Sequence, residues 1–238
     1  MRGVAFEFRF KSSSRRHVWD TFFFVGSVVA TFSQGIMLGA LVQGLEASNR
    51  LYTGGPFDWL TPFSIVCGFA MIIGYALLGS TWLIIKTEHT LQVWARQVSR
   101  WMLTALLVAM VVVTAFMYFS DIDALEGWFS FPDLLYLAPM PIIVMLLFFI
   151  MRKDLKTERE YRPFLLTVAL FLMGYIGVCF ALFPYIVPYQ MTIYEAAAAD
   201  TSLSFMLIGA CIMLPIILSY TAFAYYTFKG KSDHNPMY

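Results

Sequence analysis

A run of 27 consecutive uncharged residues, from Trp59 to Ile85, constrains the fold more than any other feature of this sequence. At about 1.5 Å per residue, a helix of this length exceeds the roughly 20 residues needed to cross a lipid bilayer. Asp58 precedes the run and Lys86 follows it. Trp59 and Trp82 lie near its ends, where indole rings favour the headgroup region. The run therefore predicts a membrane-spanning helix.

The composition of the whole chain agrees with lipid as its main solvent. Of the 238 residues, 60% are hydrophobic and 13% are charged, and a soluble domain of this length could not bury so much apolar surface. The net charge is +1 and no basic stripe alternates with aromatic residues, which argues against a nucleic-acid partner. The first ten residues contain Arg2, Glu7 and Arg9 and do not read as a signal peptide.

Six apolar runs divide the chain, and lipid offers no partner for free backbone groups, so each run is predicted to be a helix. We therefore predict an all-α, polytopic membrane protein with one transmembrane domain over residues 1–238. The fourth run is the shortest and contains Pro139 and Pro141. The predicted spans cover about residues 21–42, 59–85, 101–119, 134–150, 164–187 and 202–228.

The flanking charges provide an independent test of these crossings. Counted from the N-terminus, the segments outside the six runs hold five, one, three, none, five, none and two lysines and arginines, which account for all 16 in the chain. Membrane proteins concentrate Lys and Arg in their cytoplasmic segments, so this alternation predicts that both termini are cytoplasmic. It supports six crossings, including the fourth, better than hydropathy does.

Chemistry at membrane depth is sparse. The three histidines, His17, His89 and His234, all lie outside the apolar runs. A haem held at membrane depth by histidine is therefore not expected from this chain, and neither is a metal site. Transporters and proton pumps usually carry an acidic or basic side chain well inside the membrane, and the six runs contain no Asp, Glu, Lys, Arg or His.

Small residues indicate where helices pack. Gly35 and Gly39 form a GxxxG motif beside Gln34, and Ala70 and Gly74 form a second pair at the same spacing. Such pairs let two transmembrane backbones approach closely, so helix packing is the better interpretation of both pairs.

Two charged segments lie outside the apolar runs, and each allows a structural and a functional interpretation. Arg2, Glu7 and Arg9 are either anchors at a helix end or a charged cluster that serves proton uptake or a partner interface. Glu195, in the segment TIYEAAAAD, either ends a proton exit route or belongs to a solvated interfacial helix. Just after it, Asp200 or Thr201 is predicted to cap the last helix.

Several segments resemble subunit II of the cytochrome bd-type quinol oxidases. They occur in the same order as in that family and extend over almost the whole chain, and their residues are similar to those of the cyanide-insensitive branch. They are RGVAFEFR at 2–9, Trp19-Asp20, the run at 26–44, GGPFDWLTPFS at 54–64, YALLGSTWLIIKTE at 75–88, FPYIVP at 183–188 and LPIILSYTAFAYY at 214–226.

The resemblance implies a multi-pass subunit of a bacterial inner-membrane complex that oxidises quinol and reduces dioxygen to water. In that family, haems b and d are ligated by subunit I, which would be the partner of this chain, and a bound quinone is a further expected cofactor. Matching the family motifs residue by residue carries over Arg2, Glu7, Arg9, Gln34 and Asp58 as proton-path or interface candidates.

The resemblance also has a departure and leaves two alternatives open. Family members carry two further spans before the RGVAFEFR motif, so this sequence is expected to correspond to about the last two-thirds of a member. The alternatives are a six-helix transporter or channel subunit, and a truncated fragment that does not assemble. Against the transporter stands the lack of a repeat between the two halves of the chain.

Overall fold

The computed structural model describes residues 2–11, 15–45, 47–48, 51–119, 138–157, 159–188 and 190–231. This part of the chain is mostly helical. Its helices are α1 (Arg2–Lys11), α2 (Arg16–Gln43), α3 (Pro62–Lys86), α4 (His89–Phe119), α7 (Pro139–Asp154), α8 (Tyr161–Leu182), α9 (Ile193–Ala196) and α10 (Asp200–Thr227). Two antiparallel ribbons complete it: β1 (Ala47–Ser48) with β2 (Leu51–Tyr52), and β3 (Tyr185–Val187) with β4 (Met191–Thr192).

Five of the described helices, α2, α3, α4, α8 and α10, are long and apolar enough to cross a membrane. The fourth predicted span corresponds to α7, which has 16 residues and falls short of that length, while positions 134–137 of the span lie outside the described residues. The multi-pass helical architecture is thus confirmed in its coarse form. Six crossings and cytoplasmic termini stay predictions.

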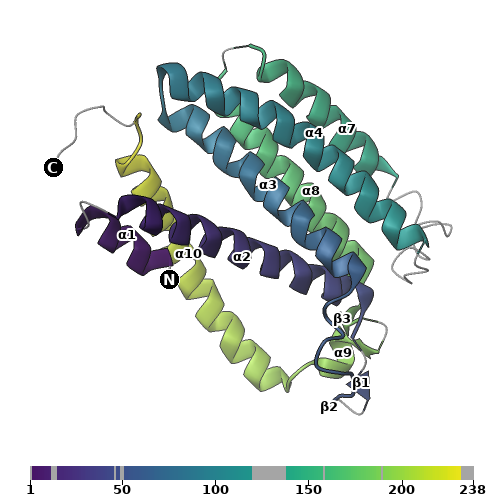
Figure 1. Ribbon diagram of the computed structural model, residues 1–238. Helices are drawn as coiled ribbons and strands as arrows, with labels where there is room; N and C mark the ends of the chain where they lie inside the picture. The colour runs from purple at the N-terminus through teal and green to yellow at the C-terminus, as the bar shows by residue number, and fades with distance from the viewer. Residues whose placement is uncertain are drawn as a thin grey trace.

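The fold has one bundle, the helix pair α1 and α2 packed across one end of it, and α10 apart from it (Figure 1). α3, α4, α7 and α8 pack around a core that contains Leu77, Ile84, Leu103, Met151 and Leu155, all nearly inaccessible. α2 crosses one end of α3, with α1 folded back against it. α10 runs away from the bundle, and none of its residues is buried.

The helical fold class is confirmed, and two small ribbons are additions that the sequence did not predict. Residues 183–187 were predicted to continue the fifth span, but α8 ends at Leu182 and Tyr185–Val187 forms β3. Pro184 explains the break, because it lacks an N–H for the helix ladder and disfavours helical backbone at the residue before it. The chain then turns and pairs with Met191–Thr192.

Three other boundaries differ from the prediction. α3 begins at Pro62 because Thr61 caps it, which leaves Trp59 and Leu60 outside the helix. α4 begins twelve residues before the predicted third span, at His89, since hydropathy detects only the part of a helix that lies at lipid depth. At α10, the N-cap is Ala199, which forms no side-chain cap, and not Asp200 or Thr201.

Candidate functional site

The crossing of α2 and α3 is built from backbone contacts at small residues. A Cβ added to Gly35 would lie 2.6 Å from the Cys67 carbonyl oxygen and 2.7 Å from the Gly68 Cα, and one added to Gly39 would lie 2.7 Å from the Ser64 Cα. Only glycine permits this approach, so the packing role predicted for the GxxxG motif is confirmed. Gln34, which precedes this motif, is exposed on α2.

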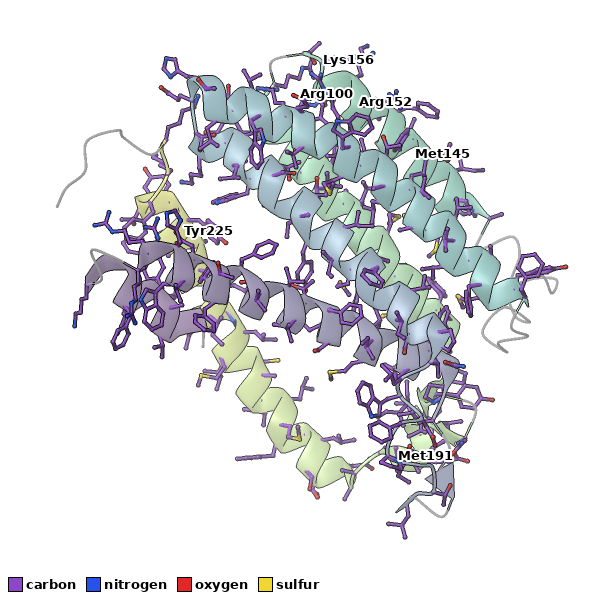
Figure 2. The ribbon with its side chains drawn as sticks, in the orientation of Figure 1. Arg100, Met145, Arg152, Lys156, Met191 and Tyr225 are labelled. Atoms are coloured by element: carbon purple, nitrogen blue, oxygen red, sulfur yellow. The ribbon has the colours of Figure 1, made fainter. Side chains whose placement is uncertain are left out.

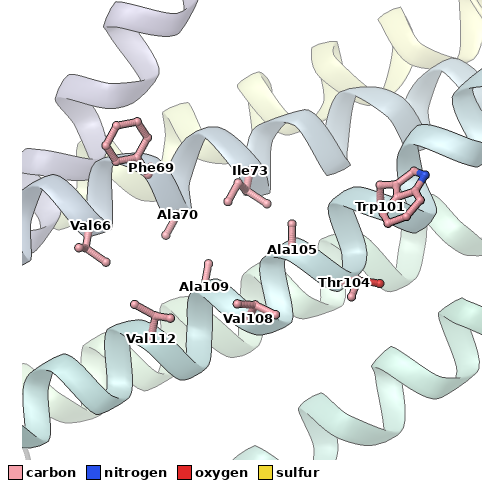
Figure 3. A pocket seen from close by; sticks show the side chains of 10 residues that line it. All are labelled: Val66, Phe69, Ala70, Ile73, Trp101, Thr104, Ala105, Val108, Ala109 and Val112. Carbon is pink, nitrogen blue, oxygen red and sulfur yellow. The ribbon is translucent and has the colours of Figure 1, made fainter.

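The two residues of the second small-residue pair, Ala70 and Gly74, have different surroundings. Gly74 lies against α8, where an added Cβ would be 3.0 Å from the Phe171 ring. Ala70 instead lines an open apolar groove of about 470 Å³ between α3 and α4, with Trp101 at one end (Figure 3). The packing prediction is therefore confirmed for Gly74, whereas Ala70 lies beside the groove between α3 and α4.

Asp58 organises the turn that leads into α3. Its Oδ2 accepts a hydrogen bond from the Gly55 N–H at 2.5 Å and one from the Tyr52 hydroxyl at 3.3 Å. The Tyr52 hydroxyl also lies 2.6 Å from the Gly55 carbonyl oxygen, and the Trp59 indole donates to the Pro56 carbonyl at 2.8 Å. The carboxylate thus satisfies backbone and side-chain donors of its own turn, which is a structural task.

A capping box follows this turn directly. The Ser64 N–H donates to the Thr61 Oγ1 at 3.0 Å, while the Thr61 N–H donates to the Ser64 Oγ at 2.9 Å. The Thr61 hydroxyl also lies 2.6 Å from the Gln43 Oε1 at the end of α2. The cap therefore satisfies orphan groups of α3 and ties α3 to α2 at the same point.

The N-terminal charges are distributed differently from the predicted cluster. Arg9 of α1 pairs with Asp20 of α2 at 2.5 Å, and the rings of Phe8 and Trp19 lie 5.2 Å apart beside this pair. Glu7 is exposed on α1, and the side chain of Arg2 lies outside the described part of the chain. The sequence did not single out Asp20 as the partner of Arg9, because the pairing depends on how α1 folds back onto α2.

Glu195 belongs to a second capping box. Its Oε2 accepts from the Thr192 N–H at 2.9 Å, and its own N–H donates to the Thr192 Oγ1 at 3.2 Å. α9 lies beside β1 and β2, at the end of the molecule opposite α1, so Glu195 and Asp58 share one end and Arg9 lies at the other (Figure 1). The predicted candidates therefore do not form one site.

The end of the bundle that carries the basic residues holds a polar network that the sequence did not reveal. Gln92 donates to the Ile84 carbonyl and to the Glu160 Oε1, both at 2.9 Å, and the Lys231 ammonium lies 2.7 Å from the same Glu160 oxygen. Lys86 donates to the carbonyls of Phe228 and Gly230. These contacts join α3, α4, the segment before α8 and the residues after α10.

Electrostatics in this network follow from the contact of Glu160 with Lys231. The hydrogen bond from Lys231 lowers the pKa of Glu160 below its ordinary value of 4.5, and the hydrogen bond from Gln92 acts in the same direction. The same contact raises the pKa of Lys231 above 10.5. Both effects favour the charged pair.

A larger apolar cavity lies where α2 meets the bundle. It has a volume of about 680 Å³ and is bordered by α2, α3, α4, α7 and α8, with Phe63, Met117, Val144, Met173 and Gly177 among its lining residues. Its walls suit a hydrophobic chain and offer no histidine for a haem iron. Among the described residues, no group of three His, Cys, Asp or Glu side chains is placed to hold a metal ion.

Comparison with known proteins gives a consistent match. A family model described as cytochrome bd terminal oxidase subunit II matches residues 1–228. The chain is 26% identical to a probable cytochrome oxidase subunit 2 of Haemophilus influenzae, 24% to a cytochrome bd ubiquinol oxidase subunit 2 of Bacillus subtilis and 25% to a cytochrome bd-I ubiquinol oxidase subunit 2 of Escherichia coli. These similarities cover 99%, 98% and 97% of this chain and 71%, 70% and 70% of the relatives.

Proposed function

Because this chain belongs to the cytochrome bd terminal oxidase subunit II family, we propose that it supports the haem-bearing subunit I of a quinol oxidase and ligates no haem itself. The observation that carries this proposal is the family match over residues 1–228, together with the position of all three histidines outside the apolar runs. In such a complex the haems b and d carry electrons from quinol to dioxygen, which is reduced to water.

The proposed place of the chain is the inner membrane of a bacterium. The five long apolar helices support a place in a bilayer. The alternation of Lys and Arg supports six crossings with both termini in the cytoplasm. On this orientation, Asp58 and Glu195 lie at the outer surface, and Arg9 with Asp20 lies at the inner surface.

A bound quinone is the second cofactor that we propose. The cavity of about 680 Å³ is lined almost wholly by apolar side chains, including several methionines that adapt to irregular ligands. These residues fit the isoprenoid chain of a quinone. The lining thus supports a quinone held by this subunit, alongside the quinol that the complex oxidises as its substrate.

The candidate residues receive separate proposed roles. We assign Arg2, Glu7 and Arg9 to the partner interface or to proton uptake at the inner surface, and exposed Gln34 to a contact with the partner at membrane depth. Asp58 and Glu195 already serve a turn and a helix cap. A proton path through either of them would have to use a carboxylate that already accepts a hydrogen bond from a nearby backbone N–H.

Co-expression with a subunit I tests the proposal. Affinity purification through a tag on this chain should recover subunit I with a haem absorption spectrum and quinol-dependent oxygen consumption. A parallel preparation from cells that express subunit I without this chain serves as the control. Recovery of a stable complex that contains no haem would contradict the oxidase assignment, and so would failure of subunit I to bind at all.

A further inference from the structure

A group of cations lies where α4 and α7 approach each other at the basic end of the bundle. Arg100 belongs to α4, Arg152 to α7, and Lys156 follows the end of α7; all three are exposed and lie close together in Figure 2. We call these three residues the α4–α7 basic surface. Lys153 is exposed beside them on α7.

The nearby described carboxylates contact other residues than these three. Asp154 is only 3% exposed and lies 3.2 Å from Arg162 and 3.7 Å from Arg159. Glu160 contacts Lys231 and Gln92, as described above. Within the described part of the chain, the three cations of the α4–α7 basic surface therefore form no ion pair with a carboxylate.

Arg100 is held in place by the fold. Its guanidinium donates to the Leu155 carbonyl at 2.8 Å, a group at the C-terminal end of α7 that the helix itself leaves without a donor. One guanidinium edge is thus fixed beside Lys156, and the group has further N–H donors for an external oxygen. A partly pre-organised arginine loses less entropy when it binds an anion.

The surroundings are those of a membrane boundary. Trp101 follows Arg100, is 69% exposed and lies at one end of the groove between α3 and α4 (Figure 3). Phe149, one turn before Arg152 on α7, is 59% exposed. The cations, the exposed indole and the apolar groove thus follow one another along the bundle. This is the order of the layers of a bilayer, in which charged headgroups are followed by the interface and then by the acyl chains.

We propose that the α4–α7 basic surface binds the phosphate of an anionic phospholipid, with an acyl chain of that lipid along the groove beside Trp101. Arg100, Arg152 and Lys156 supply the charge-assisted hydrogen bonds, and basic pockets between transmembrane helices recognise such headgroups. A soluble acidic partner would match the cations but would leave the groove without an occupant. The inference rests on the membrane position of the bundle, and not on the oxidase activity.

Tryptophan quenching tests this binding directly. The full chain, with any subunit that it retains, is placed in phosphatidylcholine bilayers with phosphatidylglycerol brominated on the acyl chain near the headgroup. The reference bilayer carries brominated phosphatidylcholine at equal mole fraction. The signal of Trp101 is the difference between the wild type and Trp101→Phe. We expect stronger quenching by the brominated phosphatidylglycerol.

Charge variants separate a site from a general charge effect. Arg152→Gln with Lys156→Gln should lower the preference for phosphatidylglycerol by about fivefold for each cation removed. The matched control is Lys11→Gln with Lys229→Gln, which removes the same charge from other surfaces and should leave the preference unchanged. Arg100 is not substituted, because it also holds the end of α7.

Four outcomes would overturn the proposal. The first is equal quenching by the two brominated lipids in the wild-type protein, and the second is an equal loss of preference in both double variants. The third is a preference that vanishes when a partner subunit is present, since the surface would then belong to that protein. Addition of inorganic phosphate should not abolish the quenching; if it does, the surface recognises free phosphate and not a lipid.

Discussion

Gly39 of α2 lies so close to Ser64 of α3 that a single added methyl group at Gly39 would be 2.7 Å from the Ser64 Cα. The same serine is part of the capping box that starts α3, and its partner Thr61 contacts Gln43 at the end of α2. The contact between the two helices and the cap that starts α3 are therefore one structural unit.

The first prediction concerns this contact. Gly39→Ala should destabilise the protein by about 1–3 kcal/mol, because the added methyl meets backbone that cannot move away cheaply. Gly79→Ala on α3 is the control, since nothing lies within 4 Å of an added Cβ there. Thermal unfolding in detergent should show a lower Tm for Gly39→Ala alone; an equal shift in both variants would refute the close contact.

The cap at Thr61 gives a second prediction. Thr61→Ala removes the side-chain acceptor of the Ser64 N–H and the contact with Gln43, and should cost about 0.5–2 kcal/mol. Thr104→Ala is the comparison, because the exposed Thr104 hydroxyl bonds only within its own helix, to the Arg100 carbonyl. Equal unfolding midpoints for wild type and Thr61→Ala in denaturant would speak against the cap.

Asp58 is the subject of a third prediction. If its carboxylate serves the turn, Asp58→Asn should keep an acceptor for the Gly55 N–H and assemble normally, whereas Asp58→Ala should lower the amount of assembled complex. The measurement is the yield of complex in membranes together with turnover per haem. Normal assembly of Asp58→Asn with a large loss of turnover would instead give the charge of Asp58 a part in proton transfer.

The contact of Glu160 with Lys231 predicts a defined pH dependence. The lowered pKa of Glu160 means that its contribution to stability is present above about 4.5 and is lost as pH falls through the folded value. The raised pKa of Lys231 means that its contribution is present below about 10.5 and is lost as pH rises through the folded value. The contact is therefore strongest between these limits.

Glu160→Gln tests this dependence. It should lower the Tm by about 1–3 °C near neutral pH, the range expected for a partly exposed ion pair, and the difference from wild type should shrink below pH 4.5. Glu88→Gln, which removes a longer contact of 3.6 Å to the same lysine, should have a smaller effect. A difference that persists unchanged at acidic pH would exclude the ion pair as its cause.

The sequence predicted those features of the fold that depend on residue patterns within a single helix. The apolar runs located the long helices, and the spacing of Gly35 and Gly39 located their closest contact, because both features repeat along a single helix. The sequence could not predict the contacts of Arg9 with Asp20 or of Gln92 with Glu160. Each of those depends on which segments meet in space, and a count of charges per segment carries no such information.

The most direct test of the central claim is the haem content of the complex purified through this chain. In complexes that carry His17→Ala, His89→Ala and His234→Ala together, we predict the same amount of haem per complex, and the same reduced-minus-oxidised absorption spectrum, as in the wild type. Loss of any haem from the triple variant, with the two subunits still bound to each other, would show that this chain ligates haem and would contradict the account.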